Sequence, residues 1–330
     1  MTAAGSEPKL HHYVPQFLLR RFANDQEQVL TIDRKTKDSF PQSISKAAAR
    51  TGFYKILNDD GSTDNRVEEA LGKIESRAAT ASAKLVDEGI FPLGDEDRDA
   101  IAAFTALQYV RTPSVRDHMS QVSDASFKAA LATDKGRASM RAVLEATGDY
   151  ETPEEIEVEL NFWADPTQYS LSHGANEHAR LMIDLAAGFS RSLFKQQLAF
   201  VRFERQRLAT CDNPVLLEGS ERTKYRGIEG RIGILNADKI WLPLAPSLAI
   251  CFTKDFAGDA ELEPHTDGAR WLNWLTANHA RRWIFYHPEH SPMKYVTLPS
   301  WEERSLDDET LQRLADPDLY LDDPLEGPDF

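Results

Sequence analysis

The sequence predicts an α+β fold, with a mixed or antiparallel sheet built from N- and C-terminal strands and a central helical subdomain between them. Near the N-terminus, Val29–Asp33 and Ser39–Ile44 alternate apolar and polar residues, which is the period of a half-buried strand. Residues 67–197 follow helical spacing instead, and the alternation returns at Leu198–Glu204. Strands at both ends of a chain with helices between them are typical of an α+β domain.

The first element is expected to be a short helix that begins at Pro15. Proline fits the first position of a helix, because its missing N–H would be unpaired there in any case. Val14, Leu18 and Phe22 then repeat every four residues and define a face that should be buried. The two strands that follow flank the polar segment Arg34–Asp38, which predicts a β-hairpin.

The middle of the chain contains the residues that start and stop helices. Gly89 should end one helix, Asp95 should cap the next, and Pro113 should break or bend it. Thr152, with Glu155 three residues later, is a capping signal for another. A turn or short helix is expected at 47–52. Helices are expected at 67–88, at 95–113, at 114–146 with a break near 132–136, from 152 onward, and at 173–197.

The C-terminal part returns to strands. A second strand is expected at Leu208–Cys211, and Ile240–Pro243 with Leu248–Phe252 should form a hairpin. Trp271–Ala280 is expected to be a helix and Trp283–Tyr286 a late strand. We predict that the N-terminal hairpin lies in the same sheet as strands drawn from residues 198–252.

The predicted domain organisation is a single α+β domain over residues 1–300, which contains the helical subdomain at 67–197, followed by an acidic C-terminal tail at 301–330. The tail holds eleven Asp or Glu against two Lys or Arg, and after Asp316 it has too few apolar residues to fold independently. Residues 1–57 hold nine Lys or Arg against five Asp or Glu. Two interpretations stay open. In the first, the tail covers the basic region or stays solvated. In the second, the basic region binds an acidic partner.

Composition limits the functional class. The chain has 330 residues, 41% of them hydrophobic, and a net charge of −15. Apolar runs fall short of the ~20 residues of a membrane helix and no secretory signal is recognisable, so we expect a cytoplasmic protein with no membrane partner. Cys211 and Cys251 are too few for a disulfide framework. Without a glycine-rich phosphate loop after a strand, NAD and ATP are not expected as cofactors.

Three short polar segments are the candidate functional motifs. They are His11–Tyr13 before the first helix, Gln108 with Arg111 near the end of another, and Asp212–Asn213 after a strand. Gln108 and Arg111 are three residues apart and therefore share a helix face. A helix N-terminus beside His11–Tyr13 would favour an anion. The predicted topology would gather the three motifs where sheet and helices pack, which is where pockets commonly occur.

These motifs also carry a family resemblance. His11–Phe22, His-His-Tyr-Val-Pro-Gln-Phe-Leu-Leu-Arg-Arg-Phe, resembles the opening of the family known as domain of unknown function 4238, which typically begins His-x-x-Pro-x-x-Tyr-Leu-x-x-Phe. Gln108–Pro113 looks like its Gln-x-x-Arg-x-Pro segment, and Thr210–Val215 looks like its Ser-Asp-Asn-Pro segment. Cys211 stands where many members carry Ser, so a hydroxyl there is not expected to be essential. The resemblance implies no activity.

The leading enzyme hypothesis is a metal-dependent hydrolase or nuclease acting on a phosphodiester or nucleotide. His11 or His12 would be the general base or a metal ligand, because imidazole titrates near neutral pH. Asp212 would orient the histidine or coordinate a divalent cofactor, Mg²⁺ or Mn²⁺. The candidate substrate-binding residues offer donors or positive charge to a phosphate: Tyr13, Gln16, Arg21, Gln108, Arg111 and Asn213.

Two non-catalytic interpretations compete with this hypothesis. In one, the protein binds a nucleotide or nucleic acid without turnover. The contacts to phosphate would then come from basic side chains near the N-terminus: Arg20, Arg21, Arg34, Lys35 and Lys37. In the other, the protein is structural or an interaction protein, and Asp212–Pro214 is an Asx turn whose side chains satisfy backbone groups. A shared site for His12 and Asp212 is the prediction that separates the enzyme from the structural interpretation.

Overall fold

The computed structural model describes residues 10–53, 56–57, 63–64, 66–150, 152–220, 232–265 and 267–301. Apart from its first residue, the predicted acidic tail at 301–330 lies outside the described residues. The described chain divides into two compact units. The first holds residues up to Val115 and again from Gly174, and the second holds Arg116–His173. The boundaries between the units therefore fall inside the segment for which we predicted a helical subdomain.

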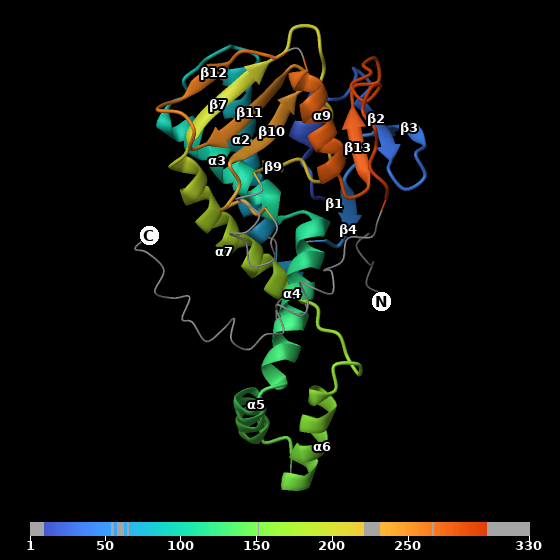
Figure 1. Ribbon diagram of the computed structural model, residues 1–330, viewed down its shortest axis with the longest axis vertical. Helices are drawn as coiled ribbons and strands as arrows, with labels where there is room; N and C mark the ends of the chain where they lie inside the picture. The colour runs from blue at the N-terminus through green and yellow to red at the C-terminus, as the bar shows by residue number, and fades with distance from the viewer. Residues whose placement is uncertain are drawn as a thin grey trace, which may run out of the picture. The chain divides into compact units, whose positions relative to one another are not determined.

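The first unit contains both main sheets and most of the helices (Figure 1). Its helices are α1 (Gln16–Arg21), α2 (Arg66–Val86), α3 (Asp95–Val110), α7 (Ala175–Phe194) and α9 (Gly268–His279). Its strands are β1 (Leu10–His12), β2 (Gln28–Asp33), β3 (Ser39–Ser43), β4 (Ala49–Thr51), β5 (Ile56–Leu57), β6 (Thr63–Asp64), β7 (Gln197–Arg202), β8 (Thr210–Cys211), β9 (Leu216–Glu218), β10 (Lys239–Ala245), β11 (Leu248–Thr253), β12 (Ala260–Leu262) and β13 (Trp283–Tyr286). The α+β class is confirmed.

The N-terminal segment is held by a small antiparallel pair and by a buried helix. β1 pairs with β4, and α1 follows with Pro15 at its N-cap, one position earlier than predicted. The predicted apolar face is confirmed, because Val14, Leu18 and Phe22 are at most 1% exposed. The turn or short helix predicted at 47–52 is wrong in part, since β4 forms here and gains ladder hydrogen bonds from β1.

The N-terminal hairpin belongs to a four-stranded sheet of order β3-β2-β13-β8. β13 lies antiparallel to β2, with Ile284 opposite Ile32, and β8 pairs with the other edge of β13. Because β8 comes from residues 198–252, the prediction that the hairpin shares a sheet with a strand from that segment is confirmed. The other strands of the segment form a separate sheet.

That second sheet has five strands in the order β12-β7-β11-β10-β9. The predicted β10–β11 hairpin is confirmed, with Trp241 opposite Cys251. β12 runs parallel to β7 while the other pairs are antiparallel, so the sheet is mixed. Successive side chains point to opposite faces, and accordingly Ile250 lies in one core cluster and Cys251 in another. Both faces are covered, which explains why every residue of β11 is buried.

Helices cover the two faces of this sheet differently. α1 and α2 contact β10 on one side, and α3 packs between α2 and α7. α9 contributes Leu272 and Leu275 to the core cluster on the opposite side (Figure 1). The expected end of α2 is confirmed, because Gly89 follows it with a φ of 67°. Asp95 is the first residue of α3 rather than its cap, which is Gly94.

The second unit consists of α5 (Asp134–Thr147), α6 (Pro153–Ala164) and most of α4 (Pro113–Leu131). The predicted break near 132–136 is confirmed by the gap between α4 and α5. Thr152 and Glu155 form the predicted capping box, with reciprocal hydrogen bonds of 3.1 and 3.3 Å. Among all the described helices, none is both long enough and apolar enough to span a membrane.

Candidate functional site

The first two predicted motifs meet at the entrance to α1. The backbone carbonyl of Tyr13 accepts hydrogen bonds from Gln108 Nε2 at 2.9 Å and from Arg111 Nε at 3.0 Å. Arg111 Nε also lies 2.9 Å from Gln108 Oε1, and its Nη1 donates to Glu75 Oε1 at 2.7 Å. Tyr13, Glu75, Gln108 and Arg111 are termed the N-terminal clasp.

The clasp joins three segments that are distant in sequence. Arg111 stands at the end of α3, Glu75 lies on α2, and Tyr13 links β1 to α1. The side chain of Arg111 is 0% exposed, whereas that of Glu75 is 29% exposed. A buried guanidinium requires hydrogen-bond partners, because removing it from water is costly. Gln108 and Arg111 therefore bind the backbone and side chains of the chain itself.

The two histidines before the helix have different partners. His11 Nε2 lies 2.7 Å from Glu68 Oε1, and the His11 side chain is only 7% exposed. His12 Nε2 lies 3.1 Å from the carbonyl oxygen of Ile44 and 3.4 Å from Gln16 Nε2. Burial lowers the pKa of His12 below its ordinary 6.5, against the opposing effect of the hydrogen bond to Ile44. His12 is therefore uncharged at neutral pH.

Asp212 lies in a different part of the fold from His12. Its Oδ1 accepts from the backbone N–H of Arg281 at 2.7 Å, and its Oδ2 accepts from those of Arg282 and Trp283 at 2.8 and 3.0 Å. The carboxylate, in a residue that is 4% exposed, thus fixes the connection between α9 and β13. β8 pairs with β13, and this pairing directs Asp212 to the backbone that precedes β13. A site that Asp212 shares with His12 stays a prediction.

Asn213 acts on the same connection as Asp212. Its Nδ2 donates to the carbonyl oxygen of His279, the last residue of α9, at 3.1 Å. Side chains of Asp and Asn commonly bind backbone groups in turns, as the structural interpretation of this motif proposed. The third motif is therefore engaged with the α9–β13 connection and does not join the N-terminal clasp.

The basic residues expected to contact phosphate are largely engaged by the protein itself. Arg21 forms two 2.8 Å hydrogen bonds with Asp87, whose pKa they lower. Arg20 pairs with Glu27. Arg34, at 6% exposure, donates to the carbonyl oxygens of Ala280 and Ser300. Lys35, another residue of this set, places its Nζ 4.7 Å from the centroid of the Trp301 ring.

The described residues contain no group of three or more His, Cys, Asp or Glu side chains arranged to hold a metal ion. Within this part of the chain, the pair of His11 and Glu68 is the closest arrangement of the predicted histidines to a catalytic dyad. A carboxylate that close to an imidazole fixes the orientation of the ring. The pair can therefore support proton transfer if a substrate reaches it.

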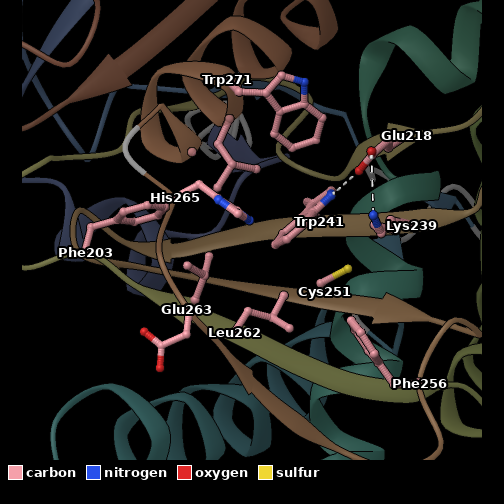
Figure 2. Close-up of a pocket in the computed structure, with 13 residues that line it drawn as sticks. Phe203, Glu218, Lys239, Trp241, Cys251, Phe256, Leu262, Glu263, His265 and Trp271 are labelled. Carbon is pink, nitrogen blue, oxygen red and sulfur yellow. Dashed lines mark hydrogen bonds and ion pairs between the residues drawn. The ribbon is translucent and has the colours of Figure 1, made fainter.

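A separate cavity of about 370 Å³ lies on the face of the five-stranded sheet that α9 covers (Figure 2). It is termed the sheet pocket. Its lining comes from the sheet, from the segment after β12 and from the start of α9. Four aromatic side chains contribute: Phe203, Trp241, Phe256 and Trp271. The rings of Trp241 and Trp271 lie 6.0 Å apart between centroids, with an angle of 73° between their planes.

Glu218 and Lys239 stand at one end of the sheet pocket (Figure 2). The indole Nε1 of Trp241 donates to Glu218 Oε2 at 2.8 Å, and Lys239 Nζ lies 3.9 Å from Glu218 Oε1. Lys239 Nζ also lies 4.0 Å from Asp255 Oδ2. Glu218 and Lys239 each expose 31% of their side chains. Glu263 and His265 line the pocket from the exposed segment after β12.

Cys251 also lines the sheet pocket, but its thiol is unsuited to nucleophilic attack. Burial raises the pKa of Cys251 to about 12, so the thiol stays protonated at neutral pH. Both cysteines of the chain are buried, each at 0% exposure. The pocket therefore offers aromatic surface and fixed polar groups rather than an activated nucleophile.

Sequence reasoning missed the sheet pocket because its residues resemble ordinary core. Trp241 lies in the apolar run of β10, where an aromatic residue is typical of the interior. The alternation of that strand does place Trp241 on the face opposite Ile240 and Leu242, and this was the available signal. The contribution of Trp271 from α9 depends on tertiary packing and has no local signature.

Comparisons with known proteins identify a family and nothing beyond it. A family model described as Protein of unknown function (DUF4238) matches residues 10–290. No curated protein matches the chain, and no solved structure does. The matched region includes all three motifs and the residues that line the sheet pocket.

Proposed function

This chain belongs to the DUF4238 family of proteins of unknown function, and we propose that it is a binding protein for a small organic molecule held in the sheet pocket. The observation that carries the proposal is an aromatic-lined cavity with a few oriented polar groups at one end. Small-molecule sites are concave and mostly apolar, with a small number of polar groups that fix the orientation of the ligand. The sheet pocket has this composition.

The size of the pocket supports a small ligand. Its volume of about 370 Å³ lies near the lower end of the ~300–1,000 Å³ that is common for ligand pockets. A polymer would instead need an extended groove, with several positive side chains along its path. In this chain, Arg20, Arg21 and Arg34 are engaged with other groups of the protein. A compact ligand therefore fits the geometry better than a nucleic acid.

The proposal is tested by ligand-induced stabilisation. A library of organic cations, carboxylates, nucleosides and sugars is screened by thermal denaturation, since a ligand that binds only the folded state raises its stability. A true ligand should stabilise the wild type and Trp274→Ala, and it should bind at least ~10-fold more weakly to Trp271→Ala. Trp274 is the matched control, because it lies on the same helix, is 47% exposed and does not line the pocket.

Stabilisation of Trp271→Ala as large as that of the wild type would place the ligand elsewhere and remove the support for this function. The unliganded melting temperatures of both variants are measured in parallel, which separates a loss of folding from a loss of binding.

A second candidate is the hydrolase or nuclease, and the 2.7 Å contact between His11 and Glu68 favours it. We propose that Glu68, in place of Asp212, would orient the histidine as general base, with a divalent metal supplied by the solution. RNA, single-stranded DNA, duplex DNA and bis(p-nitrophenyl) phosphate are incubated with the protein, with and without chelator. Turnover should be lost in Glu68→Gln and retained in Glu69→Gln, since Glu69 is exposed on the same helix turn. Absence of turnover by the wild type on all four substrates rejects this candidate.

A further inference from the structure

We propose that the ligand of the sheet pocket is an organic cation with a poorly hydrated charged end, such as a trimethylammonium group. The proposal rests on the proposed function, because it names the chemical class that the same pocket takes. Three features of the pocket carry it: the angle between the two tryptophan rings, the balance of charge in the lining, and the fixed carboxylate at its end.

The first feature is the ring geometry. Trp241 and Trp271 form an edge-to-face pair, inclined by 73° with centroids 6.0 Å apart, so their ring faces are set at an angle and do not form a slot between parallel faces (Figure 2). A nucleobase held by stacking needs parallel aromatic surfaces, and in a corner it can lie flat on one ring only. A nearly spherical group contacts both rings. Methylated ammonium groups have that shape, and aromatic cages are a common way to bind them.

The second feature is the balance of charge around the pocket. Glu218 and Glu263 line it together with one ammonium group, that of Lys239. Lys239 Nζ lies between two carboxylates, 3.9 Å from Glu218 and 4.0 Å from Asp255, so its charge is opposed on both sides. The immediate surroundings therefore carry an excess of negative charge. The net charge of −15 adds a long-range field of the same sign, which favours a cationic ligand over an anionic one.

The third feature is the orientation of Glu218. The indole of Trp241 donates to one oxygen of this carboxylate at 2.8 Å and holds it beside the ring. A carboxylate fixed next to an aromatic surface attracts the same cation as the ring does, so the two interactions reinforce each other. Apolar neighbours such as Leu262 and Phe256 penalise an ion that must keep its water. Sodium and ammonium ions are therefore poor ligands, and methylated cations are favoured.

The test compares two probes of the same shape. Choline carries a trimethylammonium group, and 3,3-dimethyl-1-butanol replaces its nitrogen with carbon and has no charge. Both are titrated into the full-length protein by calorimetry. Choline should bind about tenfold more tightly than the uncharged isostere, which lies between the cation–π contributions of an exposed and of a desolvated site. The preference should shrink in Trp271→Phe and in Glu263→Gln, and it should be unchanged in Trp274→Ala.

Each outcome decides for or against the cation. Glu263 is exposed at the rim, so Glu263→Gln remains informative even if a substitution at Trp271 impairs folding. Equal binding of the isostere, or binding of adenosine in the pocket without binding of choline, overturns the cation proposal and leaves the binding function standing. A ligand from the screen that is insensitive to Trp271→Ala overturns the binding function itself.

Discussion

Replacing Asp212 with alanine is expected to lower the free energy of unfolding by about 3 kcal/mol or more. The buried carboxylate accepts three backbone hydrogen bonds from Arg281, Arg282 and Trp283, and its removal leaves those donors without their acceptor. Asp212→Asn should cost less than Asp212→Ala, because one acceptor oxygen is retained. The measurement is equilibrium unfolding in urea, followed by circular dichroism.

The control for this prediction is Asp25→Ala, which removes an exposed carboxylate near the N-terminus and should leave stability almost unchanged. If Asp212→Ala unfolds at the same urea concentration as the wild type but abolishes an activity, the structural assignment of Asp212 is wrong. The original expectation of a site shared with His12 would then regain support.

Replacing Arg111 with methionine is expected to destabilise the protein by a similar amount, about 3 kcal/mol or more. Methionine keeps much of the side-chain volume but removes the buried donor of Glu75 and leaves the carbonyl of Tyr13 with Gln108 as its remaining donor of the clasp. The matched control is Arg77→Met, because Arg77 pairs with Asp99 across the same two helices but both side chains are about half exposed. An exposed pair of that kind contributes at most ~1 kcal/mol.

A double-mutant cycle tests whether the ion pair with Glu75 accounts for the stabilisation by Arg111. Glu75→Gln combined with Arg111→Met should be less destabilising than the sum of the two single changes, because Glu75→Gln removes the carboxylate that Arg111→Met leaves without its donor. Simple additivity would show that Arg111 is held by the Tyr13 carbonyl and Gln108 without a contribution from Glu75.

Much of the fold follows from periodicity in the sequence. The N-terminal hairpin was predicted because its strands alternate every second residue, and the β10–β11 hairpin was predicted because two apolar segments flank a short turn. The burial of Val14, Leu18 and Phe22 followed from helical spacing in the same way. Local capping chemistry was equally reliable at Thr152, where both hydrogen bonds of the box lie within four residues.

The functional assignments depended on contacts that no local pattern specifies. The sequence shows that Asp212 follows a strand, but the partner of that strand decides which backbone its carboxylate meets. The charge and the hydrogen-bond donors of Arg111 are evident from the sequence. Its partner Glu75 is not, because only the packing of α2 against α3 brings the two side chains together. Polar residues that lie in recognisable motifs can therefore serve the fold, while the sheet pocket is lined by residues whose sequence pattern resembles that of ordinary core.

The division into two units was also invisible in the sequence. Helical spacing runs through residues 67–197 without a change in period, yet α2, α3 and α7 belong to the first unit and α5 and α6 to the second. The assignment depends on which apolar faces meet, and helices of similar composition can satisfy either arrangement.

Anomalous diffraction from crystals soaked in tetramethylarsonium tests most directly whether the ligand binds in the sheet pocket or beside the motif residues. Arsenic replaces the nitrogen of tetramethylammonium in this ion, so the bound cation is located without reference to the shape of its density. We expect the strongest anomalous peak in the sheet pocket, in the corner between Trp241 and Trp271. A strongest peak beside His11 and Glu68, or an empty pocket at a concentration that saturates binding in solution, would contradict the account.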